Sequence, residues 1–328
     1  MRSLLDLGLI SLSVLAVLAA CLLGSTPMAP GRVLVALFGG GVPGDQTIIW
    51  SIRMPRALTA WLVGAALGAS GAALQGLLRN PLAEPGVLGV SATSALLATV
   101  TLYYGLTPYG AWVLPLAAVI GALIATTLIA VLAIRTQSVV TLILVGVALS
   151  AFAGALMALM LNLAPNPFTL ADMVNWTLGS VANRSIEDIV RVLPFLIAGL
   201  AILWLSRRGL SALTLGEEAA AGIGLDLKRQ RIAVVVGAGL ATGAAVSLAG
   251  AIGFVGIVAP HLVRPWVDSD PARTVLPSAL LGGVMLVIAD IGVRLIPTGS
   301  ELKLGVVAAL IGAPIFAWIA AQARPGRG

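Results

Sequence analysis

One stretch decides the fold of this chain: RMPRALTAWLVGAALGASGAALQGLLRNPLAEPGVLGV, residues 53–90. Two arginines, Arg53 and Arg56, stand before a hydrophobic span rich in Gly and Ala. The span ends in an Asn-Pro-Leu-Ala-Glu-Pro-Gly turn. A helix that only faces lipid needs large apolar residues, whereas small residues at almost every other position let helices approach closely. The stretch therefore predicts a tightly packed membrane helix, with a stiff polar turn, in a bundle that acts at both faces of a bilayer.

The composition of the whole chain predicts the same class. Hydrophobic residues make up 59% of the 328 residues, charged residues 10%, and the mean hydropathy is +1.07. Soluble domains have about 45–50% apolar and about 25% charged residues. Several apolar runs are long enough to cross a hydrocarbon core of about 30 Å. The sequence thus predicts an all-α polytopic membrane protein, and the high pI of about 10.4 fits basic loops at a membrane rather than nucleic-acid binding.

Cys21 is the only cysteine, which excludes an internal disulfide framework. The segment before it, Leu18-Ala19-Ala20-Cys21, resembles a lipoprotein cleavage site. The alternative, an uncleaved first transmembrane helix, is favoured because Asp6 weakens the basic start that a leader needs.

Hydropathy predicts about ten transmembrane helices. The region 230–267 could be one helix or two, but 38 residues in one helix would extend about 57 Å. Gly250, Gly253 and Gly256, followed by Pro260, offer a place to turn, so we predict two helices. The predicted spans are 7–24, 57–78, 88–105, 111–134, 139–161, 189–206, 230–250, 252–267, 275–296 and 304–322.

The distribution of basic residues orients the predicted bundle. With both termini in the cytoplasm, 12 of the 19 Lys and Arg residues lie in cytoplasmic segments and 7 outside. This distribution follows the positive-inside rule. The outer basic residues, Arg53, Arg56 and Arg294 among them, run against the rule, which suggests an acidic partner outside.

The longest predicted cytoplasmic loop is 207–231, RRGLSALTLGEEAAAGIGLDLKRQR. Residues 217–221 are good helix formers, and Gly222 and Gly224 suit a helix end. We predict a short helix that contacts a partner, with a solvated connector as the alternative.

No catalytic motif is present in the sequence. The nucleotide-binding motif G-x-x-x-x-G-K-[ST] is absent, and the single histidine, His261, cannot form a histidine-rich metal site. Asp290 stands four residues before Arg294, where the two side chains can pair on one helix face. This pair has a functional interpretation and a purely structural one. Few other charges lie inside the spans, so the energy for any transport is expected to come from outside this chain.

Eight motifs follow one another from about Ile49 to Trp318. Their order and spacing resemble the ABC importer permeases for iron–siderophore complexes, haem and vitamin B12, the FecCD/BtuC type. The motifs are Arg53-Met-Pro-Arg56, Gly71-x-x-x-Gln75, Arg79–Gly86, Leu88-Gly89, Gly250–Arg264, Asp290-x-x-x-Arg294, Glu301-Leu-x-x-Gly305 and Ile311–Phe316.

The resemblance implies the type II importer permease fold: one transmembrane permease domain over residues 1–328, in the bacterial inner membrane, acting as a homodimer. Two cytoplasmic ATPases would bind ATP and Mg²⁺, so no cofactor is expected in this chain, and a soluble substrate-binding protein would dock outside. The implied sites are Arg53, Arg56 and Arg294 for docking of that protein; Gly216, Glu217, Glu218 and Gly224, within the loop 207–231, for coupling to the ATPases; and Asn80, Pro81, Leu82, Val139 and Val140 for a cytoplasmic gate.

Two positions depart from the family pattern. Ala220-Ala221 replaces a common Ala-Arg in the coupling loop, and Lys303 replaces a usual proline. At the gate, a constriction of valines would close by excluding water.

The family resemblance leaves the cargo open between a ferric siderophore, haem, cobalamin and another chelate. Two other classes of function were weighed. An ion-coupled secondary transporter would work without ATPases, and an intramembrane enzyme would need a nucleophile that the neighbours of His261 do not supply.

Overall fold

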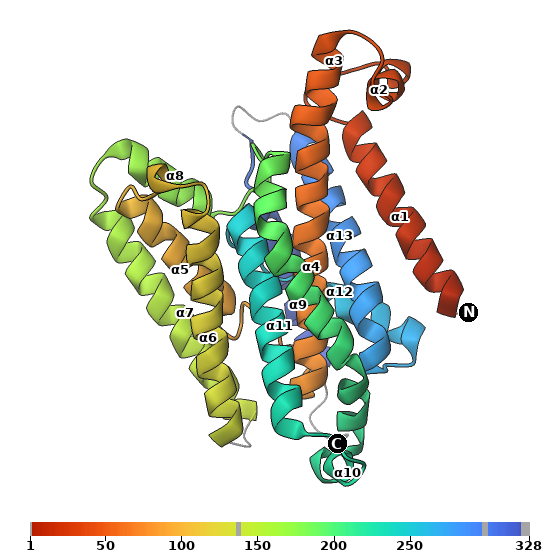
Figure 1. The fold of residues 1–328 in the computed structure, drawn as a ribbon, viewed down its shortest axis with the longest axis vertical. Coiled ribbons are helices and arrows are strands. Elements are labelled where there is room, and N and C mark those ends of the chain that lie inside the picture. The colour runs from red at the N-terminus through yellow and green to blue at the C-terminus, as the bar shows by residue number, and fades with distance from the viewer. Residues whose placement is uncertain (1, 136–138, 297–300, 323–328) are drawn as a thin grey trace.

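The computed structural model describes residues 2–135, 139–296 and 301–322, and over these ranges the chain consists of helices joined by turns and loops. The long elements form a bundle, and short helices cover its two ends (Figure 1). In chain order the helices are α1 (Arg2–Leu22), α2 (Pro30–Leu37), α3 (Pro43–Thr47), η1 (Ile48–Arg53), α4 (Met54–Leu78), α5 (Val90–Tyr103), η2 (Thr107–Tyr109), α6 (Val113–Arg135), α7 (Val139–Asn162), α8 (Pro167–Thr177), α9 (Ile186–Ala212), η3 (Leu213–Leu215), α10 (Glu217–Gly222), α11 (Leu227–Ala249), α12 (Val255–Val263), η4 (Arg264–Val267), α13 (Pro271–Leu295) and α14 (Leu304–Gln322).

Seven helical stretches in the described ranges are long and apolar enough to cross a bilayer, which confirms a multi-pass helical architecture. The predicted count of ten is not confirmed, because the remaining three candidates are short. Helix α12 has nine residues and reaches only about 14 Å. Helices α5 and α14 are the two shorter apolar helices.

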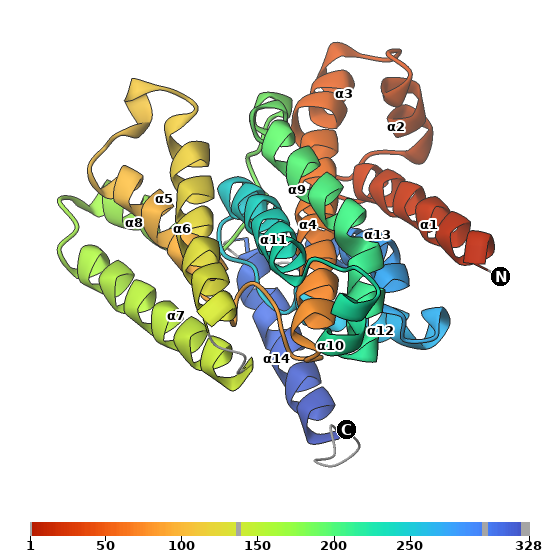
Figure 2. The ribbon, with the colours of Figure 1, turned by 60° about the horizontal axis from the view of Figure 1, so that its bottom comes forward.

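Helix α4 lies in the middle of the bundle, between α9, α11 and α13, with α1 on one side and the group α5–α8 on the other (Figures 1 and 2). Its small residues explain this position. A Cβ atom on Gly64 would lie 2.2 Å from the Gly282 carbonyl oxygen, and one on Gly71 would lie 1.9 Å from that of Gly256. Only glycine permits backbones to approach this closely. The sequence correctly predicts the tight packing of this span.

The region 230–267 is divided in two, as predicted. Helix α11 ends at Gly250, which has a φ of +69°, and α12 begins after Phe254, which also has a φ of +69°. A Cβ atom on Gly250 would lie 2.1 Å from the Trp176 carbonyl oxygen, so the turn requires glycine there. Gly256 and Pro260 lie inside α12 instead of in the turn.

Several boundaries differ from the prediction, and local capping explains two of these differences. Helix α9 begins at Ile186 and not at 189, because Ser185 and Asp188 form a reciprocal capping box. Helix α8 was not predicted; the Asn166 side chain accepts a hydrogen bond from Thr169 N at 2.9 Å, and Pro167 suits its first turn. The span predicted at 57–78 is continuous with a helical stretch that starts at Pro43.

Candidate functional site

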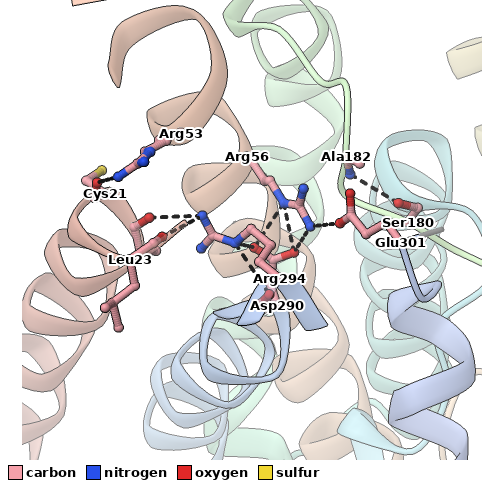
Figure 3. A network of polar contacts seen from close by, with 10 residues as sticks. Cys21, Leu23, Arg53, Arg56, Ser180, Ala182, Asp290, Arg294 and Glu301 are labelled. Atoms are coloured by element: carbon pink, nitrogen blue, oxygen red, sulfur yellow. Dashed lines mark hydrogen bonds and ion pairs between the residues drawn. The ribbon is translucent and has the colours of Figure 1, made fainter. Parts of the chain in front are cut away.

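An ion-pair cluster lies at the end of the bundle that carries α3 (Figures 1 and 3). Arg56 in α4 donates to both carboxylate oxygens of Asp290 in α13, and its Nη2 lies 2.7 Å from Asp290 Oδ1. Arg294 Nε lies 3.1 Å from Asp290 Oδ2, which confirms the predicted pair four residues apart. Arg56 also pairs with Glu301, just before α14. One buried carboxylate thus holds two arginines, and the cluster joins α4, α13 and the segment that leads into α14.

Arg53 and Arg294 hold the end of α1. Arg53 Nη1 donates to the Cys21 carbonyl at 2.7 Å and to the Leu22 carbonyl at 3.0 Å. Arg294 Nη1 donates to the carbonyls of Ala20 and Leu23, each at 3.0 Å (Figure 3). The last carbonyls of a helix lack partners within it and carry partial negative charge, so cations are stabilising there. No basic residue stands in the last turn of α1 itself. This capping from distant arginines was missed, and the local sequence carries no signal for it.

The structure therefore brings Arg53, Arg56 and Arg294 together, but as buried side chains. Arg53 is 4% exposed, and the side chain of Arg56 is 11% exposed. The side chain of Glu301 is 41% exposed, whereas that of Asp290 is 1% exposed. Of the two carboxylates on Arg56, only Glu301 is thus accessible to an approaching partner.

The turn after α4 is ordered by its own polar groups. Arg79 ends α4 with a φ of +47°, and the Asn80 side chain accepts a hydrogen bond from Leu82 N at 2.9 Å. This is the Asx arrangement that favours asparagine in turns. The next part of the turn packs on α7, where Ser150 Oγ donates to the Gly86 carbonyl at 3.2 Å.

Residues beside the two halves of the predicted gate belong to one buried apolar cluster, whereas the gate residues themselves stay a prediction. Leu142 of α7 belongs to the same buried apolar cluster as Leu78 and Ala83. Val140 is 65% exposed. Val139 begins α7, and its side chain lies outside the described part of the structure.

A polar link that the sequence reasoning did not assign lies beside this turn. Gln75 of α4 accepts a hydrogen bond from Arg264 Nη2 at 2.6 Å and donates one to the Gly256 carbonyl at 3.1 Å. The link connects α4 with α12 and η4. Gln75, Asn80 and Arg264 also line a cavity of about 350 Å³. Both residues of the Gln75–Arg264 pair stand in the quoted motifs, yet their contact spans 189 positions and was not predictable from spacing.

Glu84 is the buried acid of the turn. Its carboxylate accepts a hydrogen bond from the backbone of Phe254, at the start of α12. Burial raises the pKa of Glu84 to about 7, and the hydrogen bond from Phe254 opposes this rise only in part. The turn thus contacts α12 through a carboxyl group that titrates near neutral pH.

The loop 207–231 contains the predicted short helix, α10, at the end of the bundle opposite α3 (Figure 1). Gly216 and Gly224, with φ values of +96° and +91°, turn the chain on either side of it. Glu217 binds Arg231 of α11 through both carboxylate oxygens at 2.7 Å. Glu218 is exposed, as are Leu215 and Ile223. Glu217 thus fixes α10 to the bundle, while neighbouring apolar side chains remain at the surface.

Comparisons with known proteins agree over nearly the full chain. The model of the FecCD transport family matches residues 12–322. The chain is 40% identical over 302 residues to the uncharacterized ABC transporter permease protein YvrB of Bacillus subtilis (strain 168), which covers 88% of this chain and 84% of the relative. It is 39% identical over 322 residues to the vitamin B12 import system permease protein BtuC of Salmonella typhimurium (strain LT2), covering 95% and 94%.

One solved structure is described as an inward-facing conformation of a metal-chelate type ABC transporter. It matches with a TM-score of 0.84 at 28% sequence identity, and the match covers 97% of this chain and 98% of that chain. The fold is therefore shared over nearly the full chain.

Proposed function

Because this chain belongs to the FecCD transport family of ABC permeases, we propose that it moves a bulky metal chelate, such as a ferric siderophore, haem or cobalamin, from the periplasm to the cytoplasm by alternating access. As a permease it is a multi-pass inner-membrane transport component and not an enzyme. The observation that carries the proposal is the end-to-end match, which includes relatives named for ABC transport and for vitamin B12 import.

The surface at α10 supports a separate cytoplasmic ATPase as the source of energy. Leu215 and Ile223 are 66% and 68% exposed on either side of α10. Exposed apolar side chains on an ordered element are typical of a protein interface. Arg231 Nη2 bonds both carboxylate oxygens of Glu217 and so links α10 to α11, which lets a force on α10 act on a long helix. We place the ATPase contact at Gly216, Glu217, Glu218 and Gly224, and the flanking glycines provide its turns.

A substrate-binding protein would dock at the outer ion-pair cluster, where it would compete with Glu301 for Arg56. Arg56 is occupied by Asp290 and Glu301, and only Glu301 is exposed. An acidic residue of the partner would replace Glu301 on Arg56, while Asp290 would remain paired with Arg56. Arginine forms two parallel hydrogen bonds to carboxylates, which suits an oriented contact. Arg53 and Arg294 then contribute by holding α1 against the cluster.

The gate would lie between the turn 79–89 and α7. The contact of Ser150 with Gly86 and the shared apolar cluster support this placement.

We further propose that two copies of the chain enclose the pathway. Apolar residues of α7 and α14 are exposed in the single chain, and a second copy would cover them: Val140, Leu144, Val147, Leu310, Ile311 and Trp318. We also propose that the chain crosses the membrane ten times, that both termini lie in the cytoplasm, and that α10 lies on the cytoplasmic side.

Co-purification tests the assignment directly. The tagged permease, expressed with the ATPase subunit of its native host, should yield a stable complex, and alanine at both Leu215 and Ile223 should release the ATPase. The matched control is alanine at Leu7 and Leu15, which are exposed on α1. A permease that transports its cargo in the absence of any ATPase would refute the proposal. The ligand bound to the cognate binding protein, purified from the same host, identifies the cargo.

A further inference from the structure

A second cavity lies at the outer end of the bundle, close to the ion-pair cluster. Its volume is about 390 Å³, and it lies between α8, the segment after it and the start of α14. Ser180 and Ala182, which line it, are seen beside Glu301 in Figure 3. The charged residues in its wall are Asp172, Arg184 and Lys303. Neither Arg184 nor the cavity has a role in the proposed docking or coupling.

Two donors in the cavity wall lack acceptors. The Arg184 guanidinium lies over the ring of Trp176, with 5.2 Å between Cζ and the ring centroid. The Nε of Arg184 and the Nε1 of Trp176 are both buried, and in the described part of the chain neither has a hydrogen-bond partner. Buried donors are almost always paired, so two such donors beside one cavity indicate an acceptor that comes from outside the chain.

The guanidinium of Arg184 also forms no ion pair in the described part of the chain. Burial lowers the pKa of Arg184, and Asp188 is the acid that opposes this change. Asp188, however, is engaged by Arg191 at 2.7 Å and by Ser185 in the cap of α9. Over the described ranges, no ion pair joins Arg184 or Lys303 to Asp172. The cavity wall thus carries two cations and one acid.

We propose that this cavity is a binding site for an oxyanion, a carboxylate or phosphate group that enters from the outer side. Arg184 presents a planar guanidinium that suits two oxygens of such a group, and Trp176 Nε1 donates to it from the wall. Lys303 adds a second positive charge. The volume fits a small polyvalent anion or one acidic arm of a larger molecule, and not a whole bulky chelate.

Binding to the purified permease in a neutral detergent tests this site. Citrate and inorganic phosphate are titrated by calorimetry at constant ionic strength, with chloride as the compensating anion. We expect wild-type protein to bind at least one of them, and Arg184→Gln to weaken that binding about tenfold or more, because charge-assisted hydrogen bonds are the strong ones. Trp176→Phe keeps the ring and removes the N–H, so it should weaken binding as well. Arg32→Gln is the matched control, since this outer arginine is exposed and pairs with Asp45.

A lipid headgroup is the other source of the same chemistry. The titrations are repeated in nanodiscs of phosphatidylcholine alone and of phosphatidylcholine with phosphatidylglycerol. If the site takes a lipid phosphate, phosphatidylglycerol suppresses citrate binding in the wild type; if it takes a free anion, the two nanodiscs give equal affinities. Equal behaviour of wild type and Arg184→Gln in every arm, or no binding to a folded wild-type protein in any arm, would overturn the proposal.

Discussion

Arg56 and Asp290 are 234 positions apart in the sequence, yet Arg56 Nη2 lies 2.7 Å from Asp290 Oδ1. The Asp290 side chain is only 1% exposed and also holds Arg294. A buried charge is stable when oppositely charged groups surround it. The loss of one of these partners leaves an uncompensated charge in the protein interior. This carboxylate therefore joins α4 to α13 at the end of the bundle that carries α3.

Asp290→Asn should strongly destabilise the permease, because two buried arginines would lose their carboxylate. Breaking a buried pair in this way costs about 3–5 kcal/mol. The measurement is thermal unfolding in detergent. Asp268→Asn is the matched control, since Asp268 pairs with Arg273 at the surface, where such pairs contribute about 0–1 kcal/mol. Equal melting temperatures for the two variants would show that the buried cluster does not support the bundle.

Gly71→Ala should prevent close packing of α4 against α12. The added Cβ would lie 1.9 Å from the Gly256 carbonyl oxygen, so two backbones must move apart. Overpacking of this kind costs about 1–3 kcal/mol or more. Gly8→Ala is the control, because nothing lies within 4 Å of a Cβ there. The yield of folded protein by size-exclusion chromatography reports the effect, and normal yield and stability for Gly71→Ala would contradict the packing described for α4.

Glu84 should make stability depend on pH. Its pKa is about 7 in the folded chain against an ordinary value of 4.5, so the folded state binds the proton more tightly than the unfolded state. Stability is then greatest below pH 4.5, declines as the pH rises towards 7, and has lost up to about 3 kcal/mol above it.

The variant Glu84→Gln isolates this effect. It should remove most of the decline between pH 5 and 7, as followed by melting temperature. Glu218→Gln, at an exposed acid of α10, serves as the control and should keep the wild-type profile. Identical pH profiles for Glu84→Gln and the wild type would show that Glu84 does not cause the pH dependence of stability.

Val139→Ala combined with Val140→Ala should raise leakage of the cargo through the permease in proteoliposomes without ATP. Smaller side chains widen the constriction and make it easier to hydrate. Alanine at Leu15, an exposed residue of α1, controls for general loss of apolar surface. If the double variant leaks no more than the wild type, the gate does not lie at the start of α7.

Much of the fold was predictable from the sequence. The Gly and Ala pattern of 57–78 predicted the packed central helix, and the glycines after 249 predicted the break between α11 and α12. The short helix in the loop 207–231 was predictable from its helix formers and glycines. In contrast, the bounds of α12 were not predictable, because apolar residues after Gly250 extend the hydropathy signal through a turn.

The sequence identified the arginines of the ion-pair cluster, but it did not predict which groups they contact. The motifs identified Arg53, Arg56 and Arg294, and spacing identified the pair Asp290–Arg294. Arg53 and Arg294 cap α1, and Arg56 and Arg294 share one carboxylate, only because tertiary packing brings distant segments together. The same holds for Gln75 with Arg264 and for the unpaired Arg184, which stands in no motif.

We propose that ATP hydrolysis on a separate subunit drives uptake through this permease. The most direct measurement is uptake of the identified cargo into proteoliposomes that contain the permease and its ATPase, with the binding protein outside and ATP inside. We predict uptake only with ATP, and a large loss in Glu217→Ala, because α10 would no longer be fixed to Arg231. Uptake that proceeds without ATP when a proton or sodium gradient is imposed would contradict the account.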